Sequence, residues 1–262
     1  MEANILLHAS SAHTSSYIVR LVALFCGLHL IMATSRICIV TGANKGIGYQ
    51  IARKMGASGM KVIMGCRNAE LGQQATADLV KEGYDVDFLP LDISSKDSID
   101  QFAERFERTY QKVDILVNNA GFAFKGSDPT PFAQQAGPTF NINFFGTLNL
   151  TQKLLPLLKK SDDPRIINVA SMTGHLKILK SQAKKDFFLN PNLTMDEVVG
   201  AVNEYLEEVQ KKGTDNSFAN SNYGMSKLAV ISMTRILARD EPGIKVNCFC
   251  PGMLQLCLNV AS

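Results

Sequence analysis

The sequence lacks tryptophan and has few residues suited to binding a metal ion or forming disulfides. Its 262 residues include four histidines and six cysteines. The histidines (His8, His13, His29 and His175) are scattered, and no cysteines are spaced as C-x-x-C. This pattern is neither that of a zinc site nor that of a disulfide framework. We therefore expect no metal ion, reduced thiols and a cytoplasmic location.

Strong charge and long hydrophobic runs are also missing. The net charge is +3, and no lysine or arginine tract follows the pattern of a nucleic-acid binder. The apolar run from Leu21 to Ala33 has 13 residues, whereas about 20 residues are needed to cross a bilayer. We expect residues 1–31 to be an extension outside the fold and residues 32–262 to be the domain. A membrane-directing role for residues 17–33 stays the alternative.

From Arg36 onward, short apolar runs alternate with amphipathic stretches. Such alternation is typical of an α/β protein with a single doubly wound parallel sheet of the Rossmann type. The expected strands are residues 36–41, 61–66, 85–91, 113–117, 165–170 and 245–250. The expected helices include residues 70–82, a helix capped by Ser95, residues 139–158 and a helix that carries Tyr223.

A glycine-rich turn connects the first expected strand to a helix. The segment Thr41-Gly42-Ala43-Asn44-Lys45-Gly46-Ile47-Gly48 opens that helix, whose expected inner face is Ile47, Ile51 and Met55. Glycines let the backbone approach a pyrophosphate, which the helix N-terminus attracts. The segment predicts dinucleotide binding; the alternative is a turn whose glycines serve only a tight connection.

The end of the second strand indicates which dinucleotide. An NAD site places a carboxylate there for the ribose hydroxyls, whereas this chain has Arg67 there and Lys45 in the glycine turn. Two cations suit a 2′-phosphate, so we expect NADPH. Glu70 lies close by in the sequence, and a solvated Arg67 is the alternative.

Tyr223 and Lys227 are four residues apart in a segment that favours a helix, so both side chains lie on one face. A phenol beside a desolvated ammonium can transfer a proton near neutral pH. An exposed helix with a solvated lysine is the alternative for this spacing alone.

Taken in order along the chain, these motifs resemble the short-chain dehydrogenase/reductase superfamily. The set comprises the glycine turn, Asp92, Asn118-Asn119-Ala120-Gly121, Asn143, Ser171, Tyr223 with Lys227, and Pro251-Gly252. The segments 121–125 and 128–132 are similar to those of NADPH-dependent carbonyl reductases within that superfamily.

The resemblance implies four catalytic residues, which are Asn143, Ser171, Tyr223 and Lys227. Tyr223 would donate a proton to a carbonyl oxygen that Ser171 also binds, and Lys227 would hold the nicotinamide ribose and lower the pKa of Tyr223. Asn143 would support a water relay to Lys227. The alternatives are a turn serine at position 171 and a packing or kink asparagine at position 143.

The resemblance also implies a set of cofactor-binding residues. In that set Asp92 would accept from the adenine amine, although a turn or N-cap aspartate is the alternative. The full set is Gly42, Asn44, Lys45, Gly46, Ile47, Gly48, Arg67, Asp92, Asn119, Ala120, Gly121, Tyr223, Lys227, Pro251 and Gly252.

Two stretches depart from the superfamily pattern. Ser171 and Tyr223 are separated by 51 residues, and Thr194 to Glu197 read as a capping box before an apolar stripe, so we expect a helical insertion at about 175–219. Carbonyl reductases are similar in having such an insertion where other members dimerise, which implies a monomer. After Pro251-Gly252, members of the superfamily normally continue with a threonine-bearing segment, a substrate-side loop and a further strand, which this sequence lacks. We therefore expect a truncated C-terminal end that leaves the substrate pocket short of one wall.

The predicted function is NADPH-dependent reduction of aldehydes, ketones or quinones. Phe122, Phe124, Phe144 and Met172 are expected at the edge of the substrate pocket and favour bulky apolar substrates. The alternative is a catalytically impaired, truncated NADPH-binding protein. A nucleotide-sugar epimerase is disfavoured by the glycine spacing and by the lack of a second domain.

Overall fold

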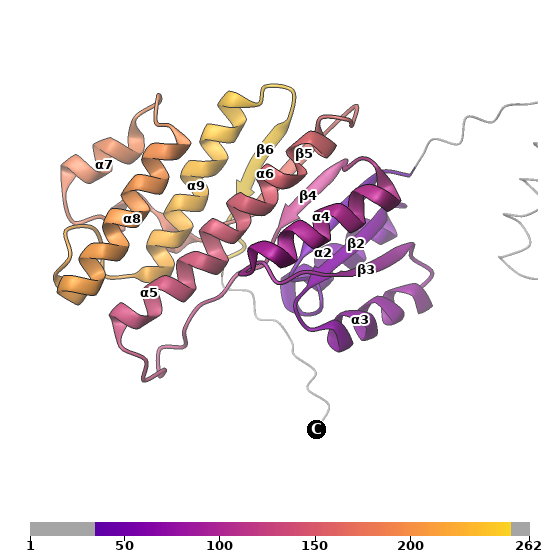
Figure 1. Ribbon diagram of the computed structural model, residues 1–262, viewed down its shortest axis with the longest axis horizontal. Coiled ribbons are helices and arrows are strands. Elements are labelled where there is room, and N and C mark those ends of the chain that lie inside the picture. The colour runs from indigo at the N-terminus through magenta and orange to yellow at the C-terminus, as the bar shows by residue number, and fades with distance from the viewer. Residues whose placement is uncertain (1–34, 253–262) are drawn as a thin grey trace, which may run out of the picture. The chain divides into compact units, whose positions relative to one another are not determined.

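The computed structural model describes residues 35–252 of the chain (Figure 1). The predicted extension at residues 1–31, its membrane-directing alternative and the segment after Gly252 lie outside these described residues. Within residues 35–252, no helix combines the length and apolar character needed to span a bilayer.

In the described chain, six parallel strands form one sheet in the order β3-β2-β1-β4-β5-β6, which confirms the predicted doubly wound fold (Figure 1). The strand order reverses between β1 and β4, so the loops that follow these two strands diverge. A crevice at such a reversal is the usual ligand site of this architecture. The strands are β1 (Ile37–Thr41), β2 (Lys61–Cys66), β3 (Val86–Pro90), β4 (Ile115–Asn118), β5 (Arg165–Val169) and β6 (Lys245–Phe249).

Helices cover both faces of the sheet. Apolar side chains of α4, α6 and α9 form the larger core on one face, and α2 and α3 pack on the other face around Val40 and Val117. The α-helices are α2 (Gly46–Ala57), α3 (Ala69–Lys81), α4 (Lys96–Tyr110), α5 (Phe132–Phe140), α6 (Thr147–Leu158), α7 (Gln182–Leu189), α8 (Met195–Lys212) and α9 (Asn222–Asp240). The short segments are η1 (Asn141–Gly146), η2 (Met172–Gly174), η3 (Leu176–Ile178) and η4 (Gly213–Asp215).

Helix α2 turns its smallest residues toward the sheet. Gly48, Ala52 and Gly56 are its buried positions, whereas Ile51 and Met55 are only partly buried. The predicted inner face of Ile47, Ile51 and Met55 is thus confirmed in part: Ile51 and Met55 pack against the core, Ile47 is not among the packed residues, and the small residues lie closest to the sheet. The reason is the close approach of the glycine turn, since a β-carbon at position 48 would lie 2.5 Å from the Gly42 carbonyl oxygen.

The helix predicted at residues 139–158 begins earlier and is not uniform. It starts at Phe132, includes Pro138 in α5, passes through the π-helical segment η1 and continues as α6 (Figure 1). Proline forfeits one helical hydrogen bond, but burial of Phe140 against Tyr205 holds the turn in place, with ring centroids 5.4 Å apart. The predicted start at Thr139 is wrong, because packing outweighs the local effect of Pro138.

The predicted helical insertion is present as α7 and α8. Thr194 and Glu197 form the expected capping box, and the stripe that includes Val198, Val202 and Tyr205 is buried. Helix α8 packs against α5 and α9, beside which it lies in Figure 1. The Tyr205 hydroxyl donates to Asn222 Oδ1 at 2.8 Å, so the insertion is tied to the first residue of α9.

Candidate active site

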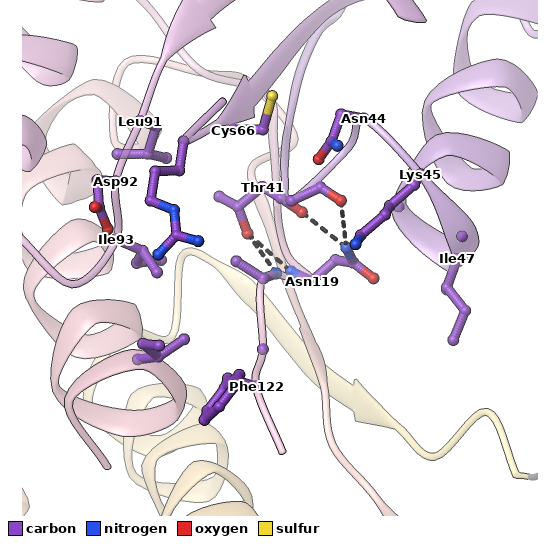
Figure 2. A pocket seen from close by; sticks show the side chains of 17 residues that line it. Thr41, Asn44, Lys45, Ile47, Cys66, Leu91, Asp92, Ile93, Asn119 and Phe122 are labelled. Atoms are coloured by element: carbon purple, nitrogen blue, oxygen red, sulfur yellow. Dashed lines mark hydrogen bonds between the residues drawn. The ribbon is translucent and has the colours of Figure 1, made fainter. Parts of the chain in front are cut away.

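A groove of about 480 Å³ opens at the carboxyl ends of β1, β2 and β4, where the strand order reverses (Figure 2). Eleven of the predicted cofactor residues line it, which are Gly42, Asn44, Lys45, Gly46, Ile47, Gly48, Arg67, Asp92, Asn119, Ala120 and Gly121. The groove also includes Phe122, which was expected at the edge of the substrate pocket. The other lining residues were not predicted for the cofactor site; they are Thr41, Cys66, Leu91, Ile93 and Ile142.

Hydrogen bonds between Thr41 and Asn119 build the floor of the groove (Figure 2). Thr41 Oγ1 accepts from the backbone nitrogens of Asn119 and Ala120 at 3.0 and 2.9 Å. In return, Asn119 Nδ2 donates to the Thr41 carbonyl oxygen at 2.8 Å. These contacts fix the end of β1 against the end of β4.

The glycines of the turn allow it to pack closely against the end of β4. Gly42 and Gly46 have φ values of 64° and 59°, a region that side-chain-bearing residues rarely adopt. A β-carbon at Gly48 would lie 2.4 Å from Asn119 Nδ2. The glycines are therefore required by the approach of two backbones, and the same approach exposes the N-terminus of α2 to the groove.

The groove contains both predicted cations, Arg67 after β2 and Lys45 in the glycine turn. Arg67 and Lys45 both line the groove, whereas Glu70 is not among its lining residues. Asp92 Oδ1 accepts from the backbone nitrogen and hydroxyl of Ser94 at 3.0 and 2.6 Å. Asp92 thus holds its own turn, as the alternative for this residue predicts, while it also lines the groove.

Ser171 and Tyr223 meet beyond Gly121. Ser171 Oγ accepts from the backbone nitrogen and hydroxyl of Thr173, which leaves its own proton for the phenol oxygen of Tyr223. Burial raises the pKa of Tyr223, and the hydrogen bond with Ser171 opposes that rise. The phenol is therefore protonated at neutral pH.

Lys227 is buried beside the same point. Its Nζ donates to the Val169 carbonyl oxygen at 2.7 Å and would lie 3.5 Å from a β-carbon at Gly121. Burial lowers the pKa of Lys227 to about 8. The pKa of Tyr223 is raised by burial, so the net lowering expected beside Lys227 is not observed for the polypeptide alone. The Lys227 ammonium is directed at Val169 and lies 5.7 Å from the centroid of the phenol ring.

Two glycines allow the Ser171 loop to approach α9. A β-carbon at Gly174 would lie 2.8 Å from the backbone carbon of Lys227, and one at Gly224 would lie 2.8 Å from the Thr173 carbonyl oxygen. The backbones of the loop and the helix are therefore in direct contact. This contact sets the separation of Ser171 from Tyr223.

Asn143 lies in the π-helical segment η1 and is 1% exposed. Its Oδ1 accepts from the Phe122 nitrogen at 2.7 Å, and its Nδ2 donates to the Phe122 oxygen at 2.9 Å and to Ser226 Oγ at 2.9 Å. The Asn143 carboxamide thus bonds to both the backbone nitrogen and the backbone oxygen of Phe122. π-Helical turns often occur at functional sites.

Comparisons with known proteins agree with this geometry. Residues 36–183 match the sequence profile described as short chain dehydrogenase. The mouse protein "Carbonyl reductase [NADPH] 1" is 40% identical over 237 residues, which covers 86% of this chain and 84% of the mouse protein. The chain belongs to the short-chain dehydrogenase family.

Solved structures of other short-chain dehydrogenases superimpose on most of the chain. Salutaridine reductase from Papaver somniferum has a TM-score of 0.76 at 29% identity and covers 83% of this chain and 86% of its own. Menthone neomenthol reductase from Mentha piperita has a TM-score of 0.77 at 27% identity, with coverages of 84% and 90%. This chain is accordingly an oxidoreductase of the short-chain dehydrogenase type.

In this short-chain dehydrogenase the predicted residues fall into two neighbouring groups. The groove holds the eleven residues named above, and Ser171, Tyr223, Lys227 and Asn143 gather next to Gly121. Pro251 and Gly252 follow β6 and are not among the residues that line the groove. Asn118 lies beneath the groove and donates to Thr151 and Asn168.

The predicted apolar edge of the substrate pocket needs one correction. Met172 and Phe122 are exposed beside Ser171 and Gly121, and the Phe124 ring packs edge-on against Phe122. Phe144 is fully buried, so its prediction as a pocket residue is wrong. Phe144 lies on the inner side of η1, where it packs into the larger core.

Proposed function

We propose that this short-chain dehydrogenase reduces carbonyl groups of small aldehydes, ketones or quinones with NADPH. The observation that carries the proposal is the meeting of a protonated phenol, a serine hydroxyl and a buried ammonium beside Gly121, at the end of the groove. Similarity to relatives named as NADPH-dependent carbonyl reductases supports it.

The residues of the groove suit a dinucleotide with a 2′-phosphate. β-Carbons at Gly42 and Gly48 would meet Ala120 and Asn119, so these glycines let the turn pack closely against the end of β4. This packing brings the N-terminus of α2 to the groove, where it would attract a pyrophosphate. Arg67 supplies a cation at the end of β2, where an NAD site would place a carboxylate, and Lys45 supplies a second cation from the glycine turn. Lys227 would hold the nicotinamide ribose, and Asn119, Ala120 and Gly121 would form the wall of the groove.

The reaction follows from the order of these groups. Bound NADPH supplies the hydride that reduces the carbonyl carbon. Ser171 donates a hydrogen bond to the carbonyl oxygen, and Tyr223 transfers its phenolic proton to that oxygen as negative charge develops there. The ammonium of Lys227 stabilises the phenolate that Tyr223 becomes. Asn143 holds the backbone of Phe122 beside the reacting atoms.

Replacing Tyr223 with phenylalanine tests the proton donor. Because the ring stays while the proton is lost, we expect NADPH oxidation with a quinone or α-dicarbonyl to fall at least about 100-fold. NADPH binding, followed by the fluorescence of the cofactor, should change little. Tight NADPH binding by a wild-type chain without turnover on any carbonyl compound would instead favour the catalytically impaired alternative.

Replacing Arg67 with aspartate tests the cofactor preference. The substitution removes a cation and adds a carboxylate, so the KM for NADPH should rise about ten-fold or more relative to that for NADH. Lys54→Asp is the control, since it changes the net charge equally at an exposed position of α2. An unchanged NADPH to NADH ratio in Arg67→Asp would remove Arg67 from the cofactor site.

We also propose a monomer located in the cytoplasm. The packing of α8 on α5 and α9 supports the monomer, because it covers helix surfaces that would otherwise be free to pair. Light scattering of the purified chain measures its oligomeric state.

The proposed cytoplasmic location is supported by the four cysteines of the described residues, which are free thiols, as in a reducing compartment. Fractionation of expressing cells measures the location.

A further inference from the structure

Ser226 connects the helix that carries Tyr223 to the loop that borders the groove. It is fully buried in the first turns of α9. Its hydroxyl donates to the Tyr223 carbonyl oxygen at 2.8 Å and accepts from Asn143 Nδ2 at 2.9 Å. Both of its neighbours belong to the site, yet Ser226 itself neither lines the groove nor reaches the phenol of Tyr223.

The single hydroxyl proton of Ser226 determines the direction of its two hydrogen bonds. A serine hydroxyl has one proton, and here it is committed to the Tyr223 carbonyl oxygen. Ser226 can therefore only accept from Asn143. Since the carboxamide nitrogen must face Ser226, its oxygen must face the Phe122 nitrogen, which is the orientation observed.

The orientation of Asn143 in turn holds the wall of the groove. Asn143 makes two hydrogen bonds with the Phe122 backbone, and the Phe122 side chain lines the groove. A β-carbon at Gly121 would lie 3.4 Å from Asn143 Oδ1 and 3.5 Å from Lys227 Nζ. The loop at Gly121 and Phe122 is thus positioned by the same carboxamide that Ser226 orients.

We propose that Ser226 is a positioning residue, which locks the Asn143 carboxamide and so holds the Gly121–Phe122 loop against the catalytic helix. The consequence for turnover rests on the proposed function, whereas the consequence for the loop does not. Without the Ser226 hydroxyl, one amide proton of Asn143 loses its acceptor in a buried position, and the Phe122 backbone loses a fixed partner.

The test compares Ser226→Ala with Ser232→Ala in the full-length chain, with and without NADPH. Ser232 is a buried serine on the same helix, 2% exposed, in a different groove beside Arg235 and Ile236. In Ser226→Ala we expect amide hydrogen exchange in residues 120–124 to become about ten-fold faster. We expect kcat to fall roughly 10- to 100-fold, with a smaller change in the KM for the carbonyl substrate. In Ser232→Ala the exchange rates, kcat and KM should all equal those of the wild type.

A second variant covers the case in which Ser226→Ala does not fold. Ser226→Cys keeps the shape of the side chain with a somewhat larger atom and leaves no cavity, but it bonds weakly through sulfur, so it should show the same faster exchange. Wild-type exchange at residues 120–124 in a folded Ser226 variant would overturn the proposal, as would equal acceleration in Ser232→Ala. If the wild type oxidises no NADPH, the proposed function fails, and the exchange comparison still decides the role of Ser226.

Discussion

Burial acts on the two titratable side chains at the centre of the site in different ways. It raises the pKa of the Tyr223 phenol, which keeps the acid protonated, and it lowers the pKa of the Lys227 ammonium to about 8. Reduction needs both protons, one to be transferred and one to maintain a positive charge beside the phenolate. Lys227 loses its proton at a lower pH than Tyr223 does.

The rate of carbonyl reduction should therefore fall as the pH rises through about 8. Above that pH the neutral amine of Lys227 no longer stabilises the phenolate, and kcat/KM should decline by up to about ten-fold per pH unit. Measuring kcat/KM from pH 6 to pH 10 checks this. Lys227→Arg is the comparison, because arginine keeps its charge throughout; whatever activity that variant retains should not show the alkaline decline. A flat wild-type profile up to pH 10 would contradict the assignment.

Individual site residues could be predicted from the sequence where they belong to a short motif with a characteristic spacing. The glycine turn, Arg67 and Asn119 all line the groove. Their partners could not be predicted in the same way, since Thr41 meets Asn119, and Asn143 meets Ser226, across 78 and 83 positions of sequence. The lowered pKa expected for Tyr223 failed for a related reason. It depends on where Lys227 directs its ammonium, which is decided by the Val169 carbonyl on another element.

At the scale of elements, the site depends on how closely the loop after β5 approaches α9. Gly174 and Gly224 allow direct backbone contact. Helix α8 differs, because Gly200 is exposed on it and a β-carbon there would meet no described atom within 4 Å. The same substitution should have opposite effects at these two kinds of position.

Gly174→Ala should lower kcat, and Gly200→Ala should not. A β-carbon at position 174 would lie 2.8 Å from the Lys227 backbone, so the loop must move and carry Ser171 away from Tyr223. We expect a loss of roughly 10- to 100-fold in kcat. Gly200→Ala should raise the free energy of unfolding by about 0.5–1 kcal/mol with unchanged kcat. Urea denaturation and steady-state kinetics of both variants measure this, and normal kcat in Gly174→Ala would show that the loop contact does not position Ser171.

The elements themselves were largely predictable, and their ends were less so. All the predicted strands occur in the described sheet, and the Thr194–Glu197 capping box begins α8 as expected. The start of α5 at Phe132 was not predicted, because Pro138 disfavours a helix locally while the burial of Phe140 favours it. The π-helical form of η1 depends on packing in the same way.

At the scale of the molecule, the two edges of the sheet differ in character. The carboxyl edge holds the groove, while the amino edge gathers Arg36, Arg165 and Lys245 around Asp163. These residues lie at or just before the starts of β1, β5 and β6, which are far apart in sequence but belong to one sheet. The parallel sheet could be predicted from the alternation of strand and helix patterns along the sequence. The charge cluster around Asp163 could not, because it depends on which strands are neighbours in the sheet.

The Asp163 cluster should make stability depend on pH below about 4. Hydrogen bonds from Lys245 and Arg165 lower the pKa of Asp163 from 3.8 to about 2. Between these values the unfolded chain binds more protons than the folded chain, so the free energy of unfolding falls as the pH falls from about 4 to about 2. Above about pH 5 the contribution of Asp163 is complete and constant.

Asp163→Asn should therefore be less stable than the wild type at neutral pH and should lose less further stability on acidification. Because Asp163 is 38% exposed, solvent and salt weaken its ion pairs, and the difference should shrink in concentrated salt. Asp162→Asn is the control, since it makes the same change at the neighbouring exposed position. Urea denaturation at several pH values between 7 and 3 gives the three curves. If Asp163→Asn and the wild type lost equal stability between pH 4 and pH 3, the ion pairs at the amino edge would not account for the acid sensitivity of the fold.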